Sequence, residues 1–131
     1  MPPITIKPFL DIVISLGLTP VFVDINPNNF CYQIEYLENK LNKNTRAILI
    51  TYLFGMVPNI TPIIDICKRH NLFIIEDISQ CLNGKHAGVS TGNFGHAGIY
   101  SSSSTKTCDA YGGGHVICND TKLAHALRNY E

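Results

Sequence analysis

The segment that ends at Lys106 places an amine directly after a run of hydroxyl groups. It reads Tyr100-Ser101-Ser102-Ser103-Ser104-Thr105-Lys106. A lysine amine can act as a nucleophile towards a carbonyl carbon. The first residues favour a strand and the following ones a polar turn. Taken alone, such a segment is more typical of a loop with a solvated lysine than of a catalytic site.

One alternative interprets Ser103 and Lys106 as the Ser-x-x-Lys pair of penicillin-recognising enzymes. Those enzymes also need a Lys-Thr-Gly strand downstream. After Lys106 the threonine-bearing continuation is Thr107-Cys108, and no Lys-Thr-Gly sequence occurs. The sequence therefore disfavours this alternative.

An acidic pair, Glu76-Asp77, follows the apolar run at 72–75. In open α/β sheets, ligands bind at the carboxyl ends of the strands. An acidic residue at that edge is therefore a candidate for ligand binding. Taken alone, it is as often a helix N-cap or a solvated loop carboxylate.

Two glycine-rich segments follow, Gly92-Asn93-Phe94-Gly95 and Gly112-Gly113-Gly114. Glycine permits close backbone approach and positive φ angles. Neither segment is a P-loop or the Gly-x-Gly-x-x-Gly dinucleotide fingerprint. By themselves these glycines are more typical of turns than of a site.

The elements that must position these residues follow an α/β pattern. Short, nearly continuous apolar runs predict buried strands, and stripes at spacings of three and four predict helices. Gly17 suits the end of the first helix, Thr61 and Pro62 the start of the third, and Asp120 the start of the last. We expect strands over 20–24, 47–51, 72–76, 97–101 and 115–118, and helices over 9–16, 33–41, 62–69 and 121–130. This alternation predicts a mostly parallel sheet flanked by helices.

Composition narrows the class of protein. The chain has 131 residues, of which 45% are hydrophobic and 15% charged, and its formal net charge is zero. This balance argues against a charged disordered tail and against nucleic-acid binding by phosphate neutralisation. The low charge fraction predicts that this single domain packs against other protein or forms the inner part of a larger one.

The chain lacks the pattern of a secretory leader, and it has no apolar run long enough to span a membrane. The cysteines form no Cys-x-x-Cys pair, so we predict neither a metal site nor disulfides. Reduced thiols favour a cytoplasmic location. The five cysteines are Cys31, Cys67, Cys81, Cys108 and Cys118.

The motifs resemble, in order, those of the DegT/DnrJ/StrS family of pyridoxal-phosphate (PLP) sugar aminotransferases. The matching set is Glu76-Asp77-x-x-Gln80, Gly92-x-Phe94-Gly95, Ser101-x-x-x-x-Lys106 and Gly113-Gly114. The resemblance implies the aspartate-aminotransferase fold, with a three-layer, mostly parallel sheet. It identifies residues 1–131 as part of the PLP-binding large domain, without the amino-terminal phosphate loop and the carboxyl-terminal small domain.

The resemblance also implies a role for each matched residue. Lys106 matches the lysine that holds the cofactor aldehyde as a Schiff base and then moves a proton. Asp77 matches the carboxylate beside the pyridine nitrogen. Gln80 matches a side chain near the ring and its phenolic oxygen, and Ser101 matches a hydroxyl donor to the phosphate.

The implied reaction moves an amino group from glutamate or glutamine to a keto group of a nucleotide-linked deoxy sugar. The resemblance further implies a homodimer or a complementing chain. A relative that dehydrates its substrate carries histidine at the lysine position, so Lys106 favours amino transfer. Ile6, Ser102 and Gly112 depart from residues usual in the family, namely an aromatic, a phenylalanine and an acidic residue. The alternative is an inactive split-gene remnant that needs a partner chain.

Overall fold

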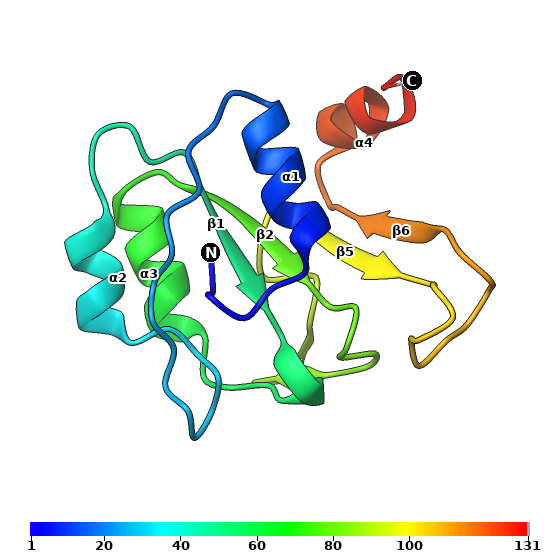
Figure 1. Cartoon of the computed structure of the whole chain (residues 1–131), viewed down its shortest axis with the longest axis horizontal. Helices are drawn as coiled ribbons and strands as arrows, with labels where there is room; N and C mark the ends of the chain where they lie inside the picture. Colours follow the sequence, from blue (N-terminus) through cyan, green and yellow to red (C-terminus); the bar gives the residue numbers. More distant parts are fainter. Residues whose placement is uncertain (131) are drawn as a thin grey trace.

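The computed structural model describes residues 1–130 (Figure 1). Helices and strands alternate over residues 34–77, as the sequence predicts, and strands then follow one another between residues 85 and 117. In chain order the elements are α1 (Lys7–Ser15), α2 (Ile34–Lys40), β1 (Ala47–Thr51), the 3-10 turn η1 (Leu53–Gly55), α3 (Thr61–Arg69), β2 (Phe73–Asp77), β3 (Lys85–His86), β4 (Val89–Ser90), β5 (Ala97–Ser101), β6 (Gly114–Ile117) and α4 (Thr121–Arg128).

The main sheet has the strand order β1-β2-β5-β6. β1, β2 and β5 are parallel, whereas β6 runs antiparallel to β5. In the register, Asp77 lies opposite Thr51 on one side and Ile99 on the other. The mostly parallel α/β sheet is therefore confirmed, and the carboxyl ends of its three parallel strands lie at one edge.

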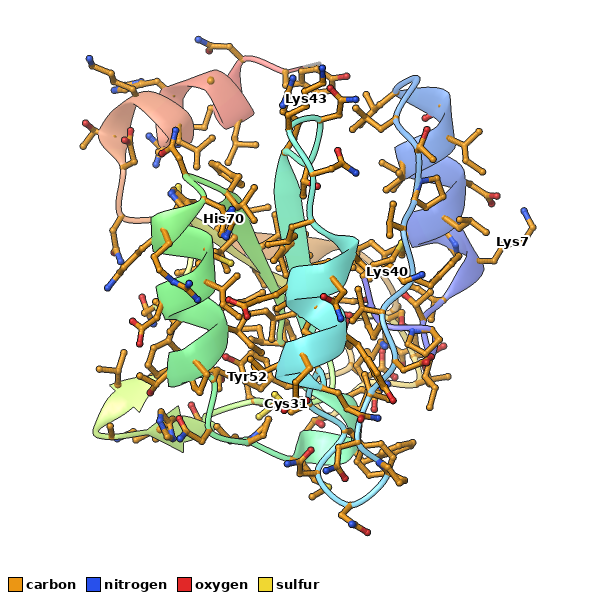
Figure 2. All side chains as sticks on the ribbon, turned by 90° about the vertical axis from the view of Figure 1, so that its left-hand side faces the viewer. Lys7, Cys31, Lys40, Lys43, Tyr52 and His70 are labelled. Atoms are coloured by element: carbon orange, nitrogen blue, oxygen red, sulfur yellow. The ribbon has the colours of Figure 1, made fainter. Side chains whose placement is uncertain are left out.

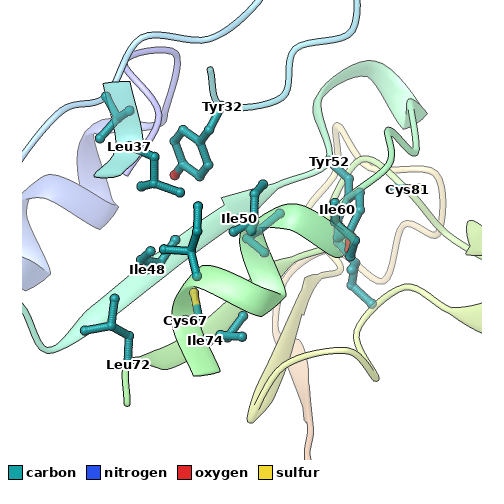
Figure 3. Close-up of a cluster of buried hydrophobic side chains, with 14 of the residues drawn as sticks. Tyr32, Leu37, Ile48, Ile50, Tyr52, Ile60, Cys67, Leu72, Ile74 and Cys81 are labelled. Atoms are coloured by element: carbon teal, nitrogen blue, oxygen red, sulfur yellow. The ribbon is translucent and has the colours of Figure 1, made fainter. Parts of the chain in front are cut away.

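The core lies between one face of this sheet and helices α2 and α3 (Figures 1 and 3). Ile48 and Ile74 lie opposite each other on neighbouring strands and are both buried. Ile63 and Ile66 of α3 are completely buried in the same cluster. Burial of each such side chain contributes about 1.5–3 kcal/mol, so this face anchors β1 and β2.

The expected strand over 20–24 was wrong. This segment belongs to no strand: Met1 N donates to Val21 O at 2.9 Å, Met1 O accepts from Val23 N at 3.1 Å, and Asp24 O accepts from Gln33 N at 3.2 Å. Pro2 and Pro3 follow Met1, and proline has no N–H to continue a ladder. Val21 and Phe22 are 43% and 42% exposed. An apolar segment forms a strand only where a neighbouring strand pairs with it, and this segment has no such neighbour.

Two of the three expected helix ends are confirmed. After α1, Gly17 adopts φ 69° while Gly17 N and Leu18 N donate to Ile14 O and Val13 O, a glycine-terminated Schellman motif. Asp120 Oδ1 accepts from Leu123 N at 2.9 Å and caps α4. The cap expected from Thr61 was wrong: Thr61 is already in the helix, and its N–H donates to Asn59 Oδ1.

The small hairpin of β3 and β4 was not predicted, because strands of two residues carry no readable periodicity. Among residues 1–130, no helix has the length and apolar character that crossing a membrane requires.

Candidate functional site

Asp77 ends β2 at the carboxyl edge of the sheet, and its side chain is only 8% exposed. Its Oδ1 atom accepts a hydrogen bond from Ser79 N at 3.0 Å. The Asp77 carbonyl accepts from Tyr52 N, which holds the end of β2 against the end of β1. The backbone thus fixes one carboxylate oxygen, while Oδ2 accepts no hydrogen bond from the residues that the structure describes.

Ser101 ends β5 at the same edge, one strand away. The backbone ladder between β2 and β5 closes with Ile78 N donating to Ile99 O at 2.9 Å. Beyond it, Ser101 N donates to Ser79 Oγ at 3.1 Å. The structure therefore brings Asp77 and Ser101 together through Ser79.

Gln80 is exposed and lies near the end of β1, because its Oε1 atom accepts from Phe54 N at 2.8 Å. Phe54 adopts φ 56°, a left-handed conformation that is strained for a bulky side chain. This conformation directs the Phe54 N–H at the glutamine. With its carbonyl oxygen engaged, Gln80 keeps its amide nitrogen as a donor for a ligand.

Lys106 lies in the loop that joins β5 to β6 and is partly buried. The loop folds back on the buried Ser102, whose carbonyl accepts from Ala110 N at 3.0 Å and whose N–H donates to Gly113 O at 3.0 Å. Gly113 has φ 80°, a conformation that favours glycine. The loop returns the chain to the edge where Ser101 lies.

Hydrogen bonds thus hold three of the four expected site residues at the carboxyl edge of the sheet, and not the fourth. Asp77, Gln80 and Ser101 are held by hydrogen bonds at the carboxyl edge. Lys106 belongs to the loop that begins there. In the described chain its ammonium group makes no hydrogen bond or ion pair with the other three.

Glu76 has a role that the sequence did not reveal. It is completely buried, so it is neither a helix N-cap nor a solvated carboxylate. Its Oε1 accepts from Phe94 N at 2.8 Å and Gly95 N at 2.6 Å, and its Oε2 accepts from Gly92 N and Tyr52 Oη, both at 2.8 Å. The carboxylate therefore fixes the Gly-x-Phe-Gly turn to the sheet. These donors offset the cost of burying its charge.

The Tyr52 hydroxyl completes this network from the end of β1. Its burial, and then the adjacent Glu76 carboxylate, raise the pKa of Tyr52 well above its usual value. Tyr52 therefore remains a proton donor to Glu76. The feature of the sequence that could have indicated this role is a tyrosine directly after a buried strand, where its hydroxyl lies at the carboxyl edge of the sheet.

Close packing explains Gly95 of this turn and Gly98 of the following strand β5. A Cβ atom on Gly95 would lie 2.8 Å from Ile74 O, and one on Gly98 would lie 2.7 Å from Gly92 Cα. Both contacts are with backbone, so neither can be relieved by a side-chain movement. The sequence favoured turns for the Gly92–Gly95 segment, and the structure shows why glycine is needed there.

The donor set at this edge fits PLP. The buried Asp77 carboxylate, with one oxygen unengaged, suits a protonated ring nitrogen. The Gln80 amide nitrogen and the Ser101 hydroxyl suit a phenolic oxygen and a phosphate. By contrast, residues 1–130 contain no group of three His, Cys, Asp or Glu side chains placed to hold a metal ion.

Residues 1–131 match the DegT/DnrJ/EryC1/StrS aminotransferase family. Among curated relatives, the pleiotropic regulatory protein of Geobacillus stearothermophilus is 40% identical over 113 residues, covering 86% of this chain and 30% of the relative. GDP-perosamine synthase of Caulobacter vibrioides is 32% identical over 112 residues, again covering 86% of this chain and 30% of the relative.

Solved structures give the same result. A DegT/DnrJ/EryC1/StrS aminotransferase from Brucella abortus matches with a TM-score of 0.88 and 35% identity, covering 97% of this chain and 36% of that one. The GDP-4-keto-6-deoxy-D-mannose-3-dehydratase of Escherichia coli, solved with bound hydrated PLP, matches with a TM-score of 0.90 and 26% identity, covering 98% and 33%. The chain spans about a third of the length of these relatives.

Proposed function

The chain belongs to the DegT/DnrJ/EryC1/StrS aminotransferase family, and we propose that it forms part of a PLP-dependent sugar aminotransferase. One observation carries the proposal. Asp77 and Ser101, on neighbouring strands, lie at one edge and are joined by Ser79, and the Lys106 loop begins at the same edge. A carboxylate and a hydroxyl on neighbouring strand ends are the groups that the ring nitrogen and the phosphate of PLP require.

Each residue has a distinct task in this proposal. When bound, PLP supplies an aldehyde and a ring that takes up the electron pair released at the α-carbon of the amino donor. Asp77 keeps the proton on the ring nitrogen, and the Ser101 hydroxyl binds the phosphate. Lys106 holds the aldehyde and, once displaced, its free amine moves a proton.

The substrate proposal is an amino donor, glutamate or glutamine, and a keto group on a nucleotide-linked deoxy sugar. The name of the Caulobacter relative, a GDP-perosamine synthase, supports the sugar nucleotide as acceptor. The matched relatives include a dehydratase, and we favour amino transfer because Lys106 supplies the amine.

A second candidate follows from coverage alone. Residues 1–131 correspond to about a third of the matched relatives, so we place them in the PLP-binding large domain. A complete site then requires further chain, a second copy in a homodimer, or a complementing chain. On this second proposal the chain is a remnant that is inactive without its partner.

Cofactor capture by Lys106 tests the proposal. We expect the chain incubated with PLP to absorb in the visible range. Borohydride reduction should then leave a pyridoxyl group on Lys106 that peptide mass spectrometry locates. Lys106→Ala should abolish both signals.

Lys43→Ala is the matched control, because Lys43 is exposed and lies at the opposite end of β1 from Tyr52 (Figure 2). It should leave both signals unchanged. Equal labelling of Lys43 and Lys106 would overturn the proposal, as would a spectrum that PLP does not change.

A further inference from the structure

Ser79 uses two different atoms to contact the two ends of the candidate site. Its backbone N–H donates to Asp77 Oδ1 at 3.0 Å. Its side-chain Oγ accepts from Ser101 N at 3.1 Å. The residue is only 7% exposed, its bond to Asp77 is buried, and its bond to Ser101 is partly buried.

The bond from Ser101 N to Ser79 Oγ takes the place of a backbone hydrogen bond between β2 and β5. The pairing of β2 with β5 ends where Asp77 lies opposite Ile99, and Ile78 N donates to Ile99 O just beyond. On its other side Ser101 is paired with Gly114 of β6. Past the end of the β2 ladder, the Ser101 N–H has the Ser79 hydroxyl as its acceptor. An unpaired, partly buried N–H would cost stability, so the hydroxyl is needed there.

The two bonds differ in what they demand of the residue at position 79. Any residue other than proline can supply the N–H that contacts Asp77. Only serine or threonine carries a hydroxyl on a side chain this short. A substitution to alanine therefore removes the link to Ser101 and leaves the link to Asp77 in place.

We infer that Ser79 is a positioning residue that sets the phosphate-binding end of the site relative to the Asp77 carboxylate. It acts through the backbone of Ser101 and holds that strand end at a fixed place beside β2. The distance between Asp77 and Ser101 is then fixed before a rigid cofactor binds to both. This inference rests on the proposed function.

The test compares PLP with pyridoxal, which has the same ring and aldehyde but no phosphate. Absorbance titrations of the wild-type chain and of Ser79→Ala give a dissociation constant for each ligand. We expect Ser79→Ala to weaken PLP binding about fivefold to tenfold, in the range for one lost hydrogen bond, and to change pyridoxal binding less than twofold. A general loss of structure would weaken both ligands alike.

Three further variants sharpen the comparison. Ser79→Thr keeps a hydroxyl and should keep the wild-type ratio of the two constants, even if it packs less well. Ser15→Ala removes a hydroxyl bonded to the Ile12 carbonyl in exposed α1 and should change neither constant. In a Ser101→Ala background, Ser79→Ala should have a smaller effect on PLP, because the two residues act in series.

The outcomes separate the inference from the proposed function. A Ser79→Ala variant that weakens both ligands equally, or neither, overturns the role of Ser79 and leaves the proposed function standing. A wild-type chain that binds neither ligand overturns the proposed function, and the inference with it. As a readout without cofactor, the Ser101 amide proton should exchange faster with solvent in Ser79→Ala, and unchanged exchange would contradict the link.

Discussion

At the scale of single residues, the pair Glu76-Asp77 shows how two adjacent carboxylates on one strand take different tasks. Successive side chains of a strand point to opposite faces. Glu76 is enclosed by four donors and fixes a turn, whereas Asp77 has one oxygen available at the sheet edge. The first carboxylate supports the structure around the second.

Glu76→Gln should therefore lower the free energy of unfolding by about 2–3 kcal/mol, because an amide nitrogen would face N–H or O–H donors that now bind a carboxylate. Urea denaturation followed by circular dichroism measures the change. Glu35→Gln, at an exposed position in the first turn of α2, is the control and should shift the value by less than about 0.5 kcal/mol. Equal effects of the two substitutions would contradict the buried network.

The sequence could assign roles to Asp77, Gln80, Ser101 and Lys106 only because their order resembles a family motif. Their assigned roles stay predictions. Ser79 carried no signal of its own, since a serine two residues after a strand is ordinary. Its contact with Ser101 spans 22 positions, and only the paired strands bring the two residues together.

At the scale of elements, the strands of the main sheet were predictable, and the segment expected as a fifth strand was wrong because it pairs with no other strand. The expected range 47–51 coincides with β1, and 97–101 coincides with β5. The segment at 20–24 is similarly apolar, but it pairs with no strand, and its backbone bonds join it to Met1 and Gln33. Composition reports which residues avoid water, whereas a ladder also depends on a partner that lies elsewhere in the chain.

Two glycines test how local geometry supports these elements. Gly17 follows α1 with φ 69° and open space around its Cα atom, so Gly17→Ala meets backbone strain alone. We expect a loss of about 1 kcal/mol. Gly95→Ala would place a Cβ atom 2.8 Å from Ile74 O and must shift the turn that Glu76 binds.

Gly95→Ala should therefore cost at least twice as much as Gly17→Ala in the free energy of unfolding, measured by urea denaturation. Similar losses for both variants would show that the Gly-x-Phe-Gly turn is not tightly packed against β2.

At the scale of the whole molecule, the low charge fraction of the sequence corresponds to an exposed apolar surface. Large apolar side chains are exposed along and after α1, which has no buried residue. They include Ile12, Ile14, Leu16, Leu18 and Phe22. That further protein covers this surface stays a prediction.

The central claim is that PLP binds at the carboxyl edge of β2 and β5. A crystal structure of the chain after PLP loading and borohydride reduction tests it most directly. We predict a pyridoxyl group on Lys106, with its ring nitrogen within hydrogen-bonding distance of Asp77 and its phosphate against Ser101. A cofactor bound to a surface lysine such as Lys43, with Asp77 and Ser101 uncontacted, would contradict it.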